Sequence, residues 1–293
     1  VFQRVGGSRI EVLITGDELL EGYWSDEHAQ TIAKAVRSLG GSISRFNIVG
    51  DHLEELKQTL SEIVQRAHVC LITGGLGPTL DDLTIDVLAE VADVKAPIVE
   101  ETWSEICSRF PQLVKAERSN RRQARLPQGA SHLSNPLGTA PAVRLQIEGC
   151  EVFALPGVPK EFRWCLSHHF IPWLKQYWGQ KKTPYLLQKT LRVALVGESV
   201  IAERIEALNL PKTVRVGYQT LGSEHRIKVS ATEEILLEET CLKIKHTADH
   251  NYLNDQDLSL SEQVIQVAGE LGVTLGFAES CTGGLLSAAL TKT

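Results

Sequence analysis

The chain has 293 residues with 30 basic and 36 acidic side chains, which leaves a formal net charge of −6 at pH 7. This length suggests two or three domains, and the acidic balance argues against a globally cationic nucleic-acid-binding protein. Because 43% of the residues are hydrophobic, the chain can bury a sizeable core, which excludes intrinsic disorder as a description of the whole.

The cysteine pattern and the lack of long apolar runs bear on location. Six cysteines are scattered along the chain without a C-x-x-C pair, so neither a zinc ribbon nor a disulfide framework is expected. No apolar run approaches the roughly 18 residues of a membrane span. We therefore predict a reducing, cytoplasmic location with no membrane partner and no nucleic-acid partner.

The first 180 residues alternate strand and helix signals. Runs of β-branched and aliphatic residues predict buried strands at 9–15, 42–49 and 68–73. Amphipathic helices are predicted between them, the second with its apolar stripe at 53–64. Adjacent strands at 144–147 and 152–155 and a long helix from Lys160 towards Trp178 follow. This order predicts a doubly wound, mostly parallel α/β sheet, in which ligands bind beyond the carboxyl ends of the strands.

The remainder predicts a small α+β module and the start of another α/β domain. A polar stretch at 179–184 sets the first domain as 1–180, and residues 251–257 separate a module at 181–252 from a segment at 253–293. The module should contain a strand, a helix, two strands and a helix, at 186–196, 199–208, 214–219, 226–231 and 233–248. The last segment should contain a helix at 260–271, a strand at 273–278 and a turn into another helix.

The first candidate site directly follows the third strand. Its loop consists of Gly74, Gly75, Gly77, Pro78 and Thr79. Glycines at such a place let backbone N–H groups approach an anion, helped by the positive end of the next helix. Asp81 and Asp82 stand at the mouth, where they could hold a divalent cation against phosphate oxygens, or a hydroxyl group. The alternative is a tight turn with helix-capping aspartates.

Acidic residues also follow the first two strands. Glu18 comes directly after the first strand, and because neighbouring strand ends face one cleft we expect it near Asp82. A solvated acidic turn is the alternative. Asp51 follows the second strand and is interpreted as the N-cap of the next helix.

A third candidate combines arginines with a polar loop. Arg121 and Arg122 precede a Gly/Pro-containing loop with Asn135, Gly138 and Thr139. Guanidinium groups suit an anion through paired hydrogen bonds, so these five residues are predicted to bind substrate. Arginines that are merely solvated on a helix are the alternative.

A fourth candidate is Ser280, in the stretch 278–284 at a predicted strand-to-helix turn. A serine at the start of a helix could act as a nucleophile whose oxyanion the helix favours. A capping serine is the alternative, since the G-x-S-x-G pattern of hydrolase elbows is missing.

Together these motifs resemble one family. The stretches GDELLEG at 16–22, GGLGPTLDDLT at 74–84, NRRQA at 120–124, NPLGTAPA at 135–142, LPGVPKEF at 155–162 and AESCTGG at 278–284 resemble the CinA, or competence/damage-inducible, family in order and spacing. The resemblance implies a MoaB/MogA-like, molybdopterin-binding-like first domain, a KH-like middle module and the start of a nicotinamide-nucleotide amidase domain.

The resemblance also implies chemistry. The first domain is expected to be a hydrolase that converts ADP-ribose to AMP and ribose 5-phosphate, with a divalent metal (Mg or Co) held by Asp81 and Asp82, with potassium, and with Glu18 and Asp82 as catalytic groups. The resemblance further implies a small-molecule nucleotide as the substrate and a homodimer as the assembly. Two alternatives are nicotinamide mononucleotide deamidation by Ser280, expected only with a complete C-terminal domain, and a non-catalytic molybdopterin- or nucleotide-binding module.

Overall fold

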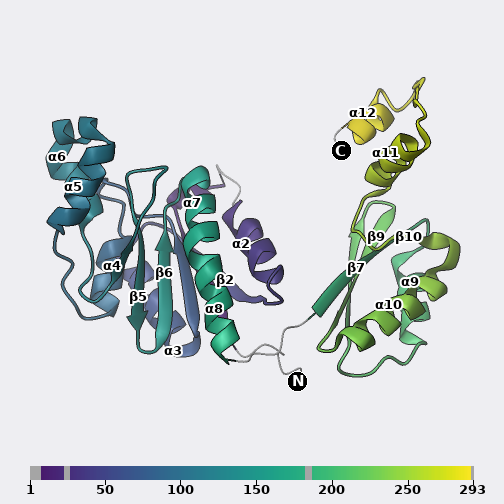
Figure 1. Ribbon diagram of the computed structural model, residues 1–293, viewed down its shortest axis with the longest axis horizontal. Coiled ribbons are helices and arrows are strands. Elements are labelled where there is room, and N and C mark those ends of the chain that lie inside the picture. Colours follow the sequence, from purple (N-terminus) through teal and green to yellow (C-terminus); the bar gives the residue numbers. More distant parts are fainter. Residues whose placement is uncertain (1–7, 23–26, 182–186, 292–293) are drawn as a thin grey trace. The chain divides into compact units, whose positions relative to one another are not determined.

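The computed structural model describes residues 8–22, 27–181 and 187–291. The chain divides into two compact units, 1–185 and 186–293, which are described separately (Figure 1). The predicted boundary at 179–184 overlaps residues 182–186, which lie outside the described residues. The segment from 253 onwards is grouped with the second unit.

The first unit is built on a six-stranded sheet with the order β2-β1-β3-β6-β5-β4. Strands β2, β1, β3 and β6 are mutually parallel, whereas β5 and β4 are antiparallel to their neighbours. The bounds are β1 Ile10–Thr15, β2 Ile43–Val49, β3 Val69–Thr73, β4 Ser131–Leu133, β5 Ala142–Ile147 and β6 Cys150–Leu155. The prediction of a mostly parallel α/β sheet is confirmed.

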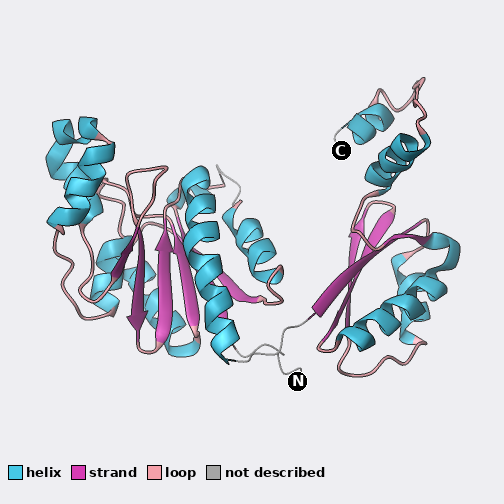
Figure 2. Ribbon diagram, in the orientation of Figure 1, coloured by secondary structure: helices cyan, strands magenta, loops and turns pink. Residues whose placement is uncertain are grey.

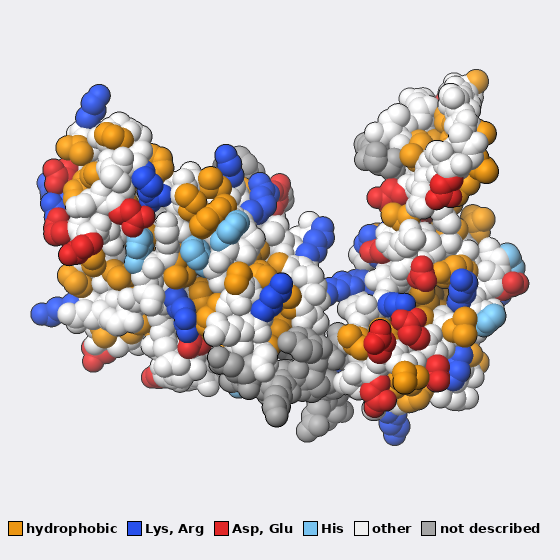
Figure 3. Space-filling model, viewed as in Figure 1, with side chains coloured by type: hydrophobic (Ala, Val, Ile, Leu, Met, Phe, Trp, Pro, Cys, Tyr) orange, Lys and Arg blue, Asp and Glu red, His pale blue; other side chains and the backbone are white. Residues whose placement is uncertain are grey.

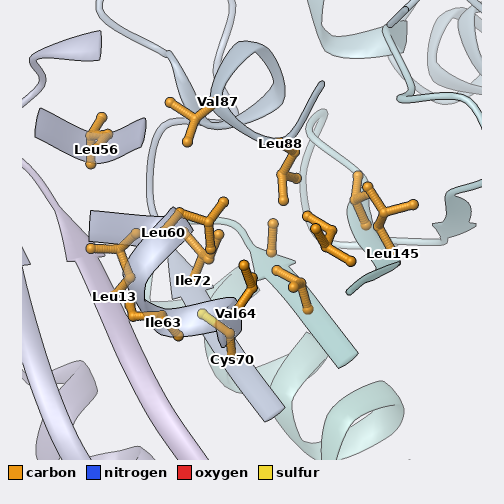
Figure 4. Packing of buried hydrophobic residues seen from close by; sticks show 14 of the residues in the cluster. Leu13, Leu56, Leu60, Ile63, Val64, Cys70, Ile72, Val87, Leu88 and Leu145 are labelled. Atoms are coloured by element: carbon orange, nitrogen blue, oxygen red, sulfur yellow. The ribbon is translucent and has the colours of Figure 1, made fainter. Parts of the chain in front are cut away.

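Helices cover both faces of this sheet (Figure 2). They are α1 Asp17–Leu20, α2 His28–Arg37, α3 Leu53–Arg66, α4 Thr84–Val91, α7 Pro159–Cys165 and α8 Ile171–Lys181, the last two joined by a π-helical turn, Leu166–Phe170. Side chains of α2, α7 and α8 form one core with the sheet, and those of α3 and α4 form another. Figure 4 shows Leu60 and Ile63 of α3 beside Ile72 of β3 in that second core.

A helical appendage lies between α4 and β4. It comprises α5 Glu100–Arg109, the 3-10 turn Pro111–Ala116, α6 Glu117–Asn120 and the 3-10 turn η2 Arg121–Ala124. Trp103, Ile106 and Ala124 form its small buried core. This core fixes the orientation of η2, which carries Gln123 to the first unit's cavity.

The second unit has an antiparallel sheet with the order β10-β7-β9-β8. Its elements are β7 Leu187–Ala194, α9 Glu198–Glu206, β8 Arg215–Leu221, β9 Glu224–Ala231, α10 Glu234–Ala248, the 3-10 turn Asp249–Asn251, β10 Tyr252–Asn254, α11 Leu260–Leu271 and α12 Leu285–Thr291. Helices α9 and α10 share a buried core with the sheet. The predicted strand-helix-strand-strand-helix order is observed.

One predicted strand does not form. Residues 273–278 have no regular secondary structure and are exposed, because no described strand lies alongside to pair with their backbone groups. Apolar side chains remain in contact with solvent here, as Figure 3 shows in orange on the upper part of the second unit, and Leu271 and Leu285 are about 70% exposed. Among the described helices, none combines the length and apolarity needed to cross a bilayer.

Candidate functional site

A cavity of about 890 Å³ opens at the carboxyl ends of the parallel strands. Thr15, Thr73 and Pro156, which end or directly follow β1, β3 and β6, line it. Strand β1 has β2 on one side and β3 on the other. The chain segments that leave the carboxyl ends of β1 and β3 therefore run in opposite directions, and a crevice opens between them. The cavity therefore lies where the sequence predicted a ligand.

The glycine loop after β3 forms one wall of this cavity. Gly74, Gly75, Gly77 and Pro78 line it, whereas Thr79 does not. The loop is held by three hydrogen bonds: Gly74 N donates to Leu155 O at 3.1 Å, Thr84 N to Gly75 O at 3.1 Å and Thr84 Oγ1 to Gly74 O at 2.7 Å. Gly74 adopts φ +103°, a conformation open to glycine and strained for other residues.

Asp82 fixes the rest of the loop. Its carboxylate accepts hydrogen bonds from Gly77 N at 2.7 Å and Thr79 N at 2.8 Å, and from the Thr79 hydroxyl. The amides of Gly74, Gly77 and Thr79 are thus engaged inside the protein. Binding of an anion by this loop stays a prediction, and these hydrogen bonds give Asp82 a positioning role at the cavity wall.

Carboxylates dominate the lining. They are Glu18, Glu27, Asp51, Asp81, Asp82 and Glu161, and none of the described lining residues is Lys or Arg. Glu18 and Asp82 thus face one cavity. Within the described ranges, no three His, Cys, Asp or Glu side chains are close enough together to form a metal-binding group. The lining therefore offers oxygen donors but no preformed all-protein metal cage.

Asp51 belongs to this acidic wall, although the sequence favoured a helix cap. Helix α3 has His52 at its N-cap and no side-chain cap. Instead Asp51 Oδ2 accepts from Asp17 N at 3.3 Å, and Asp51 N donates to Asp17 Oδ1 at 3.0 Å. Burial raises the pKa of Asp51, and the charges of Asp17, Glu18 and Asp81 act in the same direction. The signal available in the sequence was its place directly after a parallel strand.

Replacing Asp51 by asparagine should make the folded protein more stable at pH 7. A carboxyl whose pKa rises on folding holds its proton more tightly in the folded state, so the wild type loses stability as the pH rises from about 4 through the raised pKa. Asparagine avoids this loss, and we expect a gain below about 1 kcal/mol because solvent screens the partly exposed Asp51. Urea unfolding at pH 7 and pH 3, followed by tryptophan fluorescence, measures the gain and its disappearance in acid. A variant less stable than the wild type at pH 7 would contradict the prediction.

The two arginines lie away from the cavity lining. Arg121 forms ion pairs with Glu100 and Glu117, and Arg122 lies 3.8 Å from Asp86. Neither lines the cavity, whereas the next residue of η2, Gln123, does. The role of the two arginines in substrate binding stays a prediction.

The polar loop after β4 contributes Thr139 and Ala140 to the lining. Asn135 is fully buried and donates to Ala140 O at 2.8 Å and Glu161 Oε2 at 2.7 Å, so it holds the loop rather than a ligand. A Cβ at Gly138 would overlap the Glu161 carboxylate. Thr139 lines the cavity and accepts a hydrogen bond from Gln123 Nε2 at 2.9 Å.

A histidine that the sequence did not single out also lines the cavity. His28, the first residue of α2, stacks on Phe162 with ring centroids 4.1 Å apart. Its Nδ1 lies 2.9 Å from Thr73 Oγ1. Phe162 and Thr73 therefore fix the position of the imidazole ring at the cavity wall.

Ser280 lies in the second unit, in an exposed turn between α11 and α12. The adjacent Glu279 organises this turn: its carboxylate accepts from the Thr282 and Ser287 hydroxyls and from Leu286 N and Ser287 N. These hydrogen bonds lower the pKa of Glu279 to about 2. A nucleophilic role for Ser280 stays a prediction from the sequence.

Known proteins resemble this chain both in its first unit and over nearly its whole length. A family model described as "Probable molybdopterin binding domain" matches residues 11–176. A CinA-like protein of Trichormus variabilis is 36% identical over 294 residues, covering 96% of this chain and 69% of its own length. One from Escherichia coli K12 is 33% identical over 289 residues, covering 97% and 71%.

A solved structure of a protein with the same family name is also similar to this chain. It is described as the protein CinA with unknown function from Thermoplasma acidophilum, is 28% identical, and covers 55% of this chain and 94% of its own, with a TM-score of 0.52. The relatives match nearly the whole chain in sequence, and this structure matches 55% of it. The chain belongs to the CinA-like protein family, and its first unit is a molybdopterin-binding-like domain.

Proposed function

We propose that the first unit hydrolyses a nucleoside diphosphate sugar, ADP-ribose, to AMP and ribose 5-phosphate with the help of a divalent cation. The observation that carries this proposal is the cavity at the strand ends, which is large enough for a nucleotide and is lined by six carboxylates, with no Lys or Arg among the described lining residues. Such a lining repels a bare diphosphate and attracts cations.

The carboxylate oxygens of the lining suit a divalent ion such as Mg²⁺ or Co²⁺, which would enter the cavity bound to the substrate. Mg²⁺ is commonly bound by one or two carboxylates, several waters and substrate phosphates, so no complete protein cage is needed. Glu18 and Asp81 are the proposed ligands, since Asp82 is engaged with its own loop. When bound, the cation supplies positive charge against the diphosphate oxygens. Potassium is proposed as a further counter-ion.

The chain's own residues would bind the substrate and move a proton. Hydrolysis joins a water oxygen to one phosphorus, and the bridging oxygen leaves with the other phosphate. Asp51 is the proposed proton acceptor, because its carboxylate lines the same cavity as Glu18 and Asp81. The loop held by Asp82 would fix the diphosphate beside it.

The test is a product assay with the full chain. ADP-ribose is incubated with MgCl₂ or CoCl₂, with and without KCl, and the products are separated by chromatography. AMP and ribose 5-phosphate should appear with the metal and disappear when EDTA is added. Intact ADP-ribose under all these conditions would overturn the proposal.

The family model favours a second candidate, a binding module without turnover. Its description as a molybdopterin-binding domain concerns another phosphorylated heterocycle, which the same cavity could hold. Tight binding of molybdopterin or ADP-ribose in calorimetry, with no product by chromatography, would favour this candidate.

A further inference from the structure

One histidine stands out in the lining of the strand-end cavity. Among the described lining residues, six carry carboxylates and none is Lys or Arg. Histidine is the other residue type whose side chain can carry a positive charge near neutral pH, and His28 represents it in the described lining. A phosphate group that enters this acidic cavity therefore meets its cationic protein partner, if it has one among the described side chains, at His28.

Two buried groups hold the ring of His28 in place. Its Nδ1 lies 2.9 Å from Thr73 Oγ1, and the ring stacks on Phe162 with an interplanar angle of 24°. Thr73 is 1% exposed and Phe162 is 0% exposed, whereas His28 is partly exposed. The surface that the ring turns to the cavity is what these two contacts leave uncovered. Because the ring is oriented before a ligand arrives, binding costs less entropy.

The contact with Thr73 places the ring at the beginning of the glycine loop. Thr73 is the last residue of β3, and Gly74, which follows it, lines the same cavity. His28 is also the first residue of α2, and the N-terminal end of a helix carries a partial positive charge. The imidazole and the glycine loop thus lie together at the carboxyl end of β3, where we propose that the diphosphate binds.

Two carboxylates of the lining directly precede the stacked rings in the chain, Glu27 before the histidine and Glu161 before the phenylalanine. Both have partners of their own. Glu161 Oε2 accepts a hydrogen bond from Asn135 Nδ2 at 2.7 Å, and Glu27 Oε2 lies 3.8 Å from a guanidinium nitrogen of Arg163. These partners offset part of the negative charge, which reduces the repulsion that a phosphate beside the imidazole would meet.

We propose that His28 is a specificity-determining residue whose protonated imidazole binds a phosphate oxygen of the nucleotide. This inference rests on the proposed function, because it takes a nucleotide to be the ligand, and it adds the residue that selects phosphorylated ligands. A hydrogen bond between two charged partners is stronger than one between neutral groups. Removal of the imidazole should therefore weaken the binding of a phosphorylated ligand and leave the binding of its nucleoside part unchanged.

The test compares AMP with adenosine, which differ by the phosphate group. Calorimetry in MgCl₂ measures the binding of both ligands to the full chain and to His28→Gln, whose amide carries no charge. The wild type should bind AMP more tightly than adenosine. In His28→Gln the affinity for AMP should fall about ten- to a hundredfold, as expected for the loss of a hydrogen bond to a charged group, whereas the affinity for adenosine should change less than about twofold.

Controls separate phosphate recognition from folding and from turnover. His168→Gln is the matched control, because His168 also stacks on an aromatic ring, Trp164 at 4.3 Å, but does not line the cavity. It should bind both ligands as the wild type does. If His28→Gln does not fold, Thr73→Val removes the hydroxyl beside Nδ1 and should also weaken AMP selectively.

The outcomes distinguish this inference from the proposed hydrolysis. A His28→Gln protein that keeps the wild-type preference for AMP, or that loses affinity for both ligands equally, overturns the inference even if ADP-ribose is hydrolysed. Selective loss of AMP binding without any product from ADP-ribose retains the inference and refutes the hydrolysis. A wild type that binds AMP no better than adenosine refutes the phosphate site.

Discussion

We expect the replacement of Asp82 by asparagine to slow the proposed hydrolysis of ADP-ribose by about a hundredfold. The carboxylate accepts from two backbone amides and one hydroxyl of the glycine loop. An asparagine turns one acceptor oxygen into a donor, which then faces an N–H group and pushes the loop out of place. Misplacement of a substrate-positioning segment by about 1 Å costs on the order of 10²-fold in rate. Steady-state kinetics of the purified variant measures the loss.

The kinetic pattern of this variant distinguishes an enzyme from a binding module. An enzyme should lose kcat, because the loop positions the diphosphate for attack, whereas a pure binder can lose only affinity. Asp86→Asn is the matched control: Asp86 lies on α4, pairs with Arg125 at 2.6 Å and does not line the cavity. Equal rates in Asp82→Asn and the wild type would contradict the positioning role.

The frame of the site was predictable because it depends on local signals. Apolar runs followed by glycine or acidic residues marked the ends of β1 and β3, and parallel strands place their carboxyl ends at one edge of the sheet. Glu18 and the glycine loop therefore reached the cavity as expected. Even Glu11, a charged residue inside a buried strand, did not break the pattern, since Arg9 and Arg66 pair with it.

What the sequence could not supply was the direction of individual side chains. Arg121, Arg122 and Gln123 are consecutive, and the packing of the helical appendage decides which of the three lines the cavity. Asp51 was wrongly predicted to cap a helix, because aspartate is common at helix N-caps and the sequence does not show that its carboxylate instead contacts Asp17. The strand predicted at 273–278 does not form for another reason. An apolar, β-branched run favours the extended conformation, but a strand also needs a neighbouring strand to pair with.

Replacing Gly74 by alanine will destabilise the first unit by about 3 to 5 kcal/mol. Gly74 has φ +103°, and a Cβ there would lie 3.0 Å from Thr15 O and 2.7 Å from Thr15 Oγ1, so backbone strain of about 1 to 3 kcal/mol adds to overpacking of similar size. Gly149→Ala is the matched control, because its φ is +84° with nothing within 4 Å of the added carbon, and strain alone should cost it about 1 to 2 kcal/mol. All five tryptophans precede residue 186, so urea unfolding followed by their fluorescence reports on the first unit. Equal losses in the two variants would show that Thr15 moves aside, and that the close approach of β1 and the glycine loop is not what holds the cavity in shape.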